Sequence, residues 1–132
     1  MCGALVAAQA LKPDIAIQIN LMLTTDTPDI HGRGTLNGVI PYPSPARLFE
    51  DTASTEQIPL QRSAQTGVLT DLSYVQLVGD GAASIDVGFP VRYSHSALEV
   101  CDLAEPEQLI RLLIAVAKGV NSSLNLKPDN QT

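Results

Sequence analysis

The sequence predicts an α/β fold built on a small, mostly parallel β-sheet. Its 132 residues suit one domain, and hydrophobic residues make up 45% of them, which is enough for a buried core. Segments that favour helices alternate with short segments that favour strands along the whole chain. That alternation is typical of parallel sheets flanked by helices. Only three or four strands can be counted, so the sheet should expose an edge that needs a partner.

The N-terminal part of the chain predicts a helix followed by a strand. Residues 3–11 are rich in Ala and Leu and favour a helix, which Pro13 ends. Residues 14–20 alternate between apolar and polar side chains, so they predict a strand with Asn20 at its end. The isoleucines that share one face of this strand are Ile15, Ile17 and Ile19.

A loop and a second helix follow. Residues 24–45 contain repeated Gly and Pro and predict a loop, with a short extended piece at 38–40. Ser44 suits the N-cap of a helix, because its hydroxyl can accept a hydrogen bond from a free backbone N–H. Pro45 suits the first helical position, where a missing N–H costs nothing. This helix should run to about Gln57.

The second half predicts two strands and a long final helix. Residues 60–65 predict a short strand and residues 83–90 a clear one, whereas residues 70–79 fit either a strand or a helix. The final helix should begin at Glu105 and end near Gly119. Its predicted apolar positions are Leu109, Ile110, Leu113, Val116, Ala117 and Val120.

Composition excludes several classes of partner. The net charge of −6 argues against nucleic acid and anionic membranes, which reward clustered Lys and Arg. No apolar run approaches the roughly 20 residues that span a bilayer. The two cysteines, Cys2 and Cys101, form neither a disulfide framework nor a Cys-x-x-Cys motif, so we expect reduced thiols in a cytoplasmic protein.

The residue patterns alone do not specify a chemistry. Neither His31 nor His95 belongs to a His or Cys cluster with metal-ligand spacing, so a hydrogen-bonded loop histidine and a metal ligand remain alternatives for His95. No Gly-x-Ser-x-Gly elbow is present. The glycines at 32–38 do not connect a strand to a helix through Lys-Ser/Thr, so they do not form a phosphate loop.

A set of ordered motifs carries a resemblance to a known family. Residues 89–100 read Phe-Pro-Val-Arg-Tyr-Ser-His-Ser-Ala-Leu-Glu-Val and precede the final helix. The other matching stretches are Leu11–Ile17, Asp26–Pro28, Ile58–Gln61 and Thr70–Asp71. Together they resemble the tetrahedral/glutamyl aminopeptidase family, whose members often carry endoglucanase or cellulase names. Residues 31–38 are similar to a sugar-operon-associated branch, and the resemblance covers residues 3–120.

The resemblance implies a fold and an activity. The fold would be a three-layer α/β/α, zinc-peptidase-like half domain with about three to five strands. Residues 1–120 would form the C-terminal part of a metallo-aminopeptidase catalytic domain, and residues 121–132 a polar tail. The family's activity is that of a hydrolase, in which two metal ions (zinc, or else cobalt or manganese) activate a water that removes the N-terminal residue of a peptide.

Two positions carry over from the family's metal site. His95 matches the C-terminal histidine ligand. Asn20 stands where the family has a ligand aspartate, and a neutral amide is a poor zinc ligand. A match displaced by a residue or two is the alternative for Asn20.

Three further positions have two interpretations each. Thr70 and Asp71 match residues near the substrate cleft, but either could instead cap a helix. Glu99 is either an acceptor that supports His95 behind the metal or an ordinary surface residue. We expect His31 to be a loop histidine.

The resemblance also implies that much of the metal site lies outside this sequence. In the family, a Glu-Glu pair and a Gly-Leu-Arg-Gly-like turn precede the matched region, and Gly3 matches the last glycine of that turn. The general base, the first histidine ligand, the bridging aspartate and a dimerisation domain would lie further upstream. A single sound ligand does not hold zinc tightly. We therefore expect this chain to be inactive alone.

Three hypotheses follow for the function. The chain could be an inactive fragment of an aminopeptidase, a non-catalytic module that pairs through its sheet edge, or a hydrolase that a second chain completes. Because the predicted sheet is short, we expect the chain to self-associate, to bind a complementing chain or to be only marginally stable. A peptide substrate is expected only for a completed enzyme.

Overall fold

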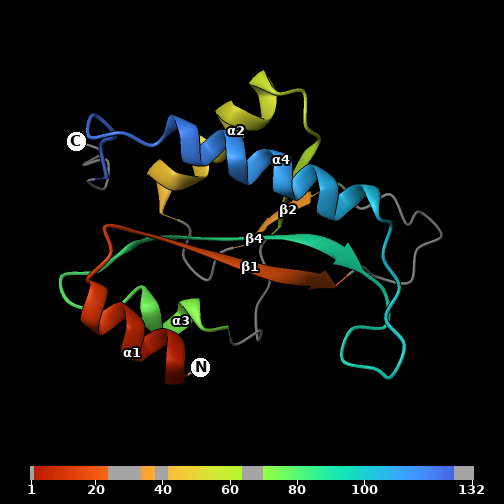
Figure 1. Ribbon diagram of the computed structural model, residues 1–132, viewed down its shortest axis with the longest axis horizontal. Helices are drawn as coiled ribbons and strands as arrows, with labels where there is room; N and C mark the ends of the chain where they lie inside the picture. The colour runs from red at the N-terminus through yellow and green to blue at the C-terminus, as the bar shows by residue number, and fades with distance from the viewer. Residues whose placement is uncertain (1, 24–33, 38–41, 64–69, 127–132) are drawn as a thin grey trace.

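The computed structural model describes residues 2–23, 34–37, 42–63 and 70–126. Helices and strands alternate along these residues, so the predicted α/β class is confirmed (Figure 1). In chain order the elements are α1 (Cys2–Leu11), β1 (Ile15–Leu23), β2 (Gly34–Asn37), α2 (Pro43–Thr55), β3 (Leu60–Ser63), α3 (Leu72–Val75), β4 (Ala83–Val91) and α4 (Ala104–Gly119). No helix in the described ranges is long and apolar enough to cross a membrane.

The four strands form one sheet in the order β1-β4-β2-β3. β1 and β4 run parallel along their nine residues, from Ile15 opposite Ala83 to Leu23 opposite Val91. β2 is antiparallel to β4 and parallel to β3. The sheet is therefore mostly parallel, as predicted, with one antiparallel pairing in its middle.

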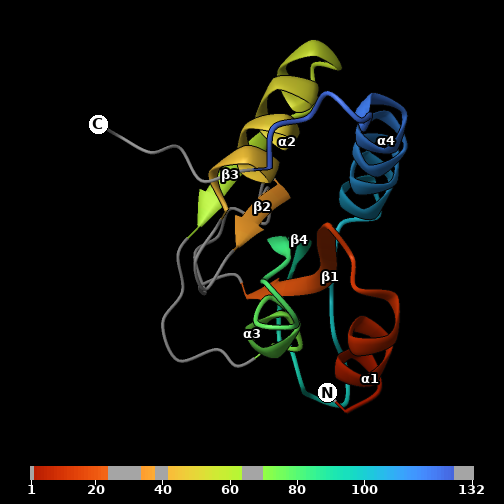
Figure 2. The same ribbon diagram turned by 90° about the vertical axis from the view of Figure 1, so that its left-hand side faces the viewer.

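Helices cover both faces of the sheet. Figure 2 shows α2 and α4 on one face and α1 and α3 on the other. Phe49 and Ala53 of α2 and Leu112 and Val116 of α4 pack with Ile85 and Val87 of β4 in the main hydrophobic core. This is the three-layer arrangement that the resemblance implied.

The opposite face of β4 contacts β1 closely. Alternate side chains of a strand point to opposite faces, so Ser84, Asp86 and Gly88 face the layer of α1 and α3. A Cβ atom added to Gly88 would lie 2.2 Å from the backbone oxygen of Asn20. Position 88 therefore has no room for a side chain. α3 is fixed to β1 where the backbone N–H of Leu72 donates to Oε1 of Gln18 at 2.6 Å.

Several local predictions need correction. Ser44 is not the N-cap of α2, because the helix begins at Pro43 and Tyr42 occupies the cap position. The first turn of a helix tolerates Pro43, because the N–H that proline lacks would have no partner within the helix there. The Ser44 hydroxyl instead donates to the backbone oxygen of Asn125 in the C-terminal tail. Asn20 is inside β1, since the strand continues to Leu23.

The remaining differences concern short elements and one helix face. β2 lies within the segment predicted as loop, and the predicted extended piece at 38–40 falls outside the described residues, as do positions 64–65 of the predicted strand. The ambiguous segment 70–79 contains the short helix α3. In α4 the buried residues are Leu109, Leu112 and Val116, whereas the predicted core positions Ile110, Ala117 and Val120 are exposed.

Candidate functional site

His95 lies on a closed loop that follows β4. The loop spans residues 92–100, and its two ends are bridged where Arg92 and Val100 exchange backbone hydrogen bonds of 2.8 and 3.2 Å. Two of its residues adopt left-handed backbone conformations, Tyr93 with φ of 59° and His95 with φ of 63°. Such conformations are uncommon for residues other than glycine and persist only where the surrounding structure imposes them. The loop therefore fixes the direction in which His95 leaves the backbone.

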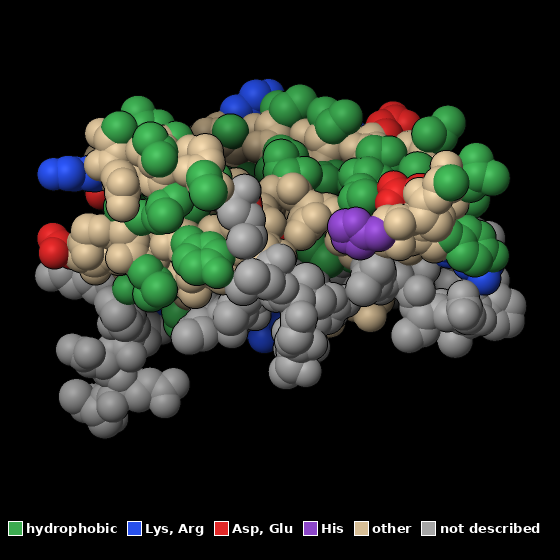
Figure 3. Space-filling model, turned by 90° about the horizontal axis from the view of Figure 1, so that it is seen from below, with side chains coloured by type: hydrophobic (Ala, Val, Ile, Leu, Met, Phe, Trp, Pro, Cys, Tyr) green, Lys and Arg blue, Asp and Glu red, His purple; other side chains and the backbone are tan. Residues whose placement is uncertain are grey.

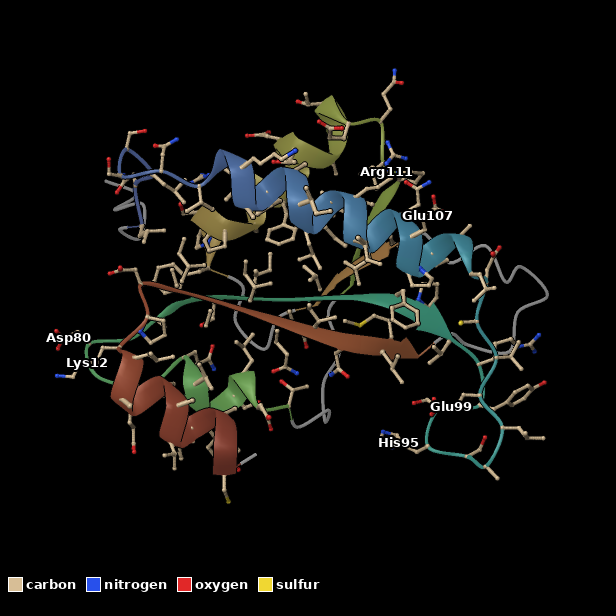
Figure 4. All side chains as sticks on the ribbon, in the orientation of Figure 1. Lys12, Asp80, His95, Glu99, Glu107 and Arg111 are labelled. Carbon is tan, nitrogen blue, oxygen red and sulfur yellow. The ribbon has the colours of Figure 1, made fainter. Side chains whose placement is uncertain are left out.

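Glu99 holds this loop in shape. Its Oε1 atom accepts a hydrogen bond from the backbone N–H of His95 at 2.7 Å. Figure 4 shows both residues on the loop beyond the end of β4. The His95 side chain is exposed to solvent. Glu99 thus supports His95 through the backbone, and its predicted role behind the imidazole stays a prediction.

Asn20 is engaged with the neighbouring strand. It lies opposite Gly88 in the parallel pairing of β1 with β4. Its Oδ1 accepts the backbone N–H of Leu21 at 2.8 Å, and its side chain hydrogen-bonds the carboxyl group of Asp86. Asp86 is on the same face of the sheet because it precedes Gly88 by two residues. The predicted ligand position is therefore part of a hydrogen-bonded pair between two strands.

Asp86 is a buried acid that the sequence reasoning missed. Its side chain is 4% exposed, and its Oδ1 atom has no hydrogen-bond partner. Burial raises the pKa of the Asp86 carboxyl to about 7, and the hydrogen bond from Asn20 opposes part of this increase. An acidic residue in the middle of a strongly apolar strand was the available signal.

Thr70 and Asp71 precede α3. Thr70 is buried, and its Oγ1 atom has no hydrogen-bond partner. Asp71 occupies the cap position of α3 but makes no capping hydrogen bond with its side chain. The helix-cap interpretation therefore lacks support for Asp71. A contribution of either residue to a substrate cleft stays a prediction.

The described residues do not assemble a metal centre. Across the described ranges, no group of three or more His, Cys, Asp or Glu side chains could hold a metal ion. The structure brings Asn20 together with Asp86, and His95 together with Glu99. His31 and the Asp26–Pro28 motif lie outside the described residues.

A sequence model of the M42 glutamyl aminopeptidase family matches residues 1–112. The chain belongs to this family. Its similarity to individual members extends over nearly its whole length. It is 35% identical over 149 aligned residues to SgcX of Escherichia coli strain K12, which is named as an aminopeptidase, with 98% of this chain covered.

Two solved structures are similar in fold and sequence. A TET aminopeptidase from the archaeon Thaumarchaeota archaeon SCGC AB-539-E09 superposes with a TM-score of 0.87 at 26% identity over 93% of this chain. The TET1 peptidase of Pyrococcus horikoshii, which can assemble into a tetrahedron or a large octahedral shell, gives a TM-score of 0.74 at 26% identity over 88% of this chain.

The M42 relatives are much longer than this chain. The matched region covers 40% of SgcX, 37% of the archaeal TET aminopeptidase and 36% of the Pyrococcus TET1 peptidase. The chain therefore corresponds to a little over a third of each of these proteins.

Proposed function

We propose that this chain is one part of a dinuclear-metal aminopeptidase and that it removes N-terminal residues from peptides only when the rest of the catalytic unit is present. One observation carries the proposal. The M42 match spans residues 1–112, yet across the described residues no three side chains gather to hold a metal ion.

The residues in the described ranges do not fit a complete metal site. Zinc sites in proteins use three or four protein ligands. His95 supplies one imidazole, and Asn20 supplies an amide that is already hydrogen-bonded to Asp86. On this basis the chain alone binds zinc, cobalt or manganese weakly. When bound in a complete site, such metals polarise the scissile carbonyl and lower the pKa of the attacking water.

The chain's own contribution would be to position groups around that site. The closed loop 92–100 presents His95 in a fixed direction, and Glu99 maintains the loop by binding the His95 backbone. Thr70 and Asp71 would line the substrate cleft next to α3. The free thiols of Cys2 and Cys101 agree with a reducing cytoplasm, which is our proposed location.

Metal content and peptidase activity test this proposal. The purified chain should carry well under one zinc ion per molecule by plasma mass spectrometry and should hydrolyse no aminoacyl-nitroanilide. Addition of the portion of SgcX outside the matched region should produce metal-dependent hydrolysis, and the His95→Ala variant should abolish it. An Asn20→Asp variant should raise the zinc affinity of the mixture. Hydrolysis by the chain alone that disappears in His95→Ala would contradict the proposal.

A non-catalytic assembly module is the second candidate. The observation that favours it is the long, uncharged strand β1 at one edge of the described sheet. This function predicts a stable complex with the same portion of SgcX but neither bound zinc nor hydrolysis.

A further inference from the structure

A groove lies between helices α2 and α4. Its volume is about 480 Å³, within the roughly 300–1,000 Å³ of small-ligand sites. Its lining side chains are exposed or half-buried, so the groove is open to solvent. We call it the α2–α4 groove. One wall includes Asp51, Thr55 and Glu56 at the end of α2, and the other includes Arg111, Ile114 and Lys118 of α4.

The two walls carry opposite charges. The charged side chains of the α2 wall are the acidic Asp51 and Glu56, and those of the α4 wall are the basic Arg111 and Lys118. In the described part of the chain no ion pair joins the two walls, and the Arg111 guanidinium donates to Oε1 of Gln108 on its own helix at 3.1 Å. The opposite layer of the molecule, by contrast, presents a mainly hydrophobic and uncharged surface in Figure 3. The groove therefore offers separate anionic and cationic walls to a molecule that carries both charges.

The acidic wall lies at the end of a helix that favours positive charge. The last turn of a helix exposes carbonyl oxygens and carries a partial negative charge, so Lys and Arg are favoured there. The last turn of α2 has no basic residue, and Glu56 is its C-cap. Glu50 of the same helix is paired with Arg62, whereas Asp51 and Glu56 have no basic partner among the described residues. A cationic group bound at this wall would reduce the repulsion between the like charges.

The basic wall has an apolar side chain between its two cations. Ile114 is one helical turn from Arg111 and one turn from Lys118, so the three side chains share one face of α4. Ile114 is 51% exposed. A ligand with an apolar side chain would cover it. The groove thus presents partners for an ammonium group, a carboxylate and an apolar group, which are the three substituents of the α-carbon of an apolar amino acid.

We propose that the α2–α4 groove binds a free α-amino acid with an apolar side chain. The ammonium group binds Asp51 and Glu56, the carboxylate binds Arg111 and Lys118 through charge-assisted hydrogen bonds, and the side chain covers Ile114. Because the groove is open to water, salt weakens this binding. The inference goes beyond the proposed function, since a chain that hydrolyses no peptide should still bind the amino acid.

NMR titration of the full 132-residue chain with L-leucine tests this proposal. Backbone amide signals of α2 and α4 around the groove should shift and saturate. Leucinamide lacks the carboxylate and N-acetylleucine lacks the ammonium group, so each should bind about tenfold more weakly or worse. Glycine leaves Ile114 uncovered and should bind about fourfold more weakly or worse.

Substitutions in each wall show which charge of the ligand it recognises. Arg111→Gln should weaken leucine binding about tenfold and remove the advantage of leucine over leucinamide. Asp51→Asn should remove the advantage of leucine over N-acetylleucine. The charge-matched controls are Lys12→Gln and Asp80→Asn, at exposed positions that Figure 4 shows at the end of α1, away from α2 and α4. Both controls should bind leucine like the wild type, and circular dichroism checks that every variant is folded.

The other results would overturn the proposal. No saturable shift would mean that the groove carries solvated surface charges alone. Equal binding of leucine, leucinamide and N-acetylleucine would mean that the two walls do not recognise a zwitterion. A homodimer that Arg111→Gln dissociates would identify a second copy of the chain as the occupant. Because none of these measurements involves hydrolysis, such results leave the proposed function standing, and a failure of metal-dependent hydrolysis leaves the amino-acid site standing.

Discussion

The two edge strands of the described sheet differ in length, charge and exposure. β3 has four residues, and the polar side chains of Gln61 and Arg62 are exposed. The guanidinium of Arg62 forms a two-pronged ion pair with the Glu50 carboxylate of α2. β1 has nine residues, none of them charged, and exposes Ile17 and Ile19 on the face beneath α4.

This difference indicates which edge is suited to water. A short strand with a charged side chain resists pairing with another chain. A long, nearly continuous apolar strand is instead typical of the interior of a parallel sheet, where both faces are covered. β3 therefore has the properties of a solvent-exposed edge, and β1 has the properties of an interior strand.

The largest expected effect comes from breaking the attachment of β1 to β4. In Gly88→Ala the added Cβ would meet the Asn20 backbone oxygen at 2.2 Å and the Met22 side chain at 2.8 Å. The two strands would have to separate, so the free energy of unfolding should fall by about 3 kcal/mol or more.

Urea denaturation of Gly88→Ala and Gly3→Ala measures this effect. A Cβ at Gly3 in α1 meets nothing within 4 Å, and alanine favours a helix, so that control should be neutral or slightly stabilising. Equal stabilities for the two variants would show that β1 is not held to β4 by this close approach.

A smaller effect should come from the buried acid beneath the same pair of strands. Because burial raises the pKa of folded Asp86 to about 7 from 3.8, folding favours its protonated form. This contribution to stability is fully present below pH 3.8 and is lost as the pH rises through 7. Asp86→Asn keeps a partner for Asn20 and removes the charge, so it should stabilise the protein by about 2 kcal/mol at pH 8.

The pH dependence distinguishes this cause from a change in packing. Unfolding free energies of the wild type and Asp86→Asn, measured from pH 4 to pH 8, should converge at the acidic end and diverge at the alkaline end. A constant difference across that range would rule out titration of Asp86 as the cause.

The sequence predicted the elements and layers better than the partners of individual side chains. The local pattern identified residues 83–90 as a strand, bounded by Gly79-Asp-Gly81 and Pro90, and nearly every residue of β4 is buried. It failed for β2, whose four residues lie among glycines and are held by pairing with β3 and β4 rather than by local propensity. It also placed Ile110 in the core, although this apolar side chain of α4 is 57% exposed.

In the candidate site, too, the sequence predicted residues but not the contacts that they make. The motif around His95 was readable as a resemblance, but the contact from Glu99 to the His95 backbone depends on a left-handed conformation that residue types did not indicate. The role of Asp86 depends on the register that brings it beside Asn20. Parallel register is set by contacts distant in sequence, so a single strand's pattern cannot reveal it.

Adding a charge to β1 should have a modest effect on stability and a clear effect on association. Ile17 is 40% exposed, so Ile17→Lys should change the unfolding free energy by about 1 kcal/mol or less. It should, however, reduce concentration-dependent light scattering of the isolated chain, because the lysine protects the free edge. Gln61→Ile on β3 tests the reverse change. If it raises scattering as much as Ile17→Lys lowers it, the two edges do not differ as we argue.

The smallest effect should come from the ion pair that protects β3. The hydrogen bond and the charge of Glu50 raise the pKa of the Arg62 guanidinium, but this side chain is 75% exposed. Water and salt therefore screen the attraction. Arg62→Ala, Glu50→Ala and the double variant should show a coupling close to the error of denaturant titrations, and it should vanish in 1 M salt. The ion pair would then contribute little to stability and would act mainly by keeping the edge strand β3 charged, so that it does not pair with another chain. A rise in light scattering of Arg62→Ala without a measurable loss of stability would support that role, whereas a large loss of stability would mean that β3 needs the pair to fold.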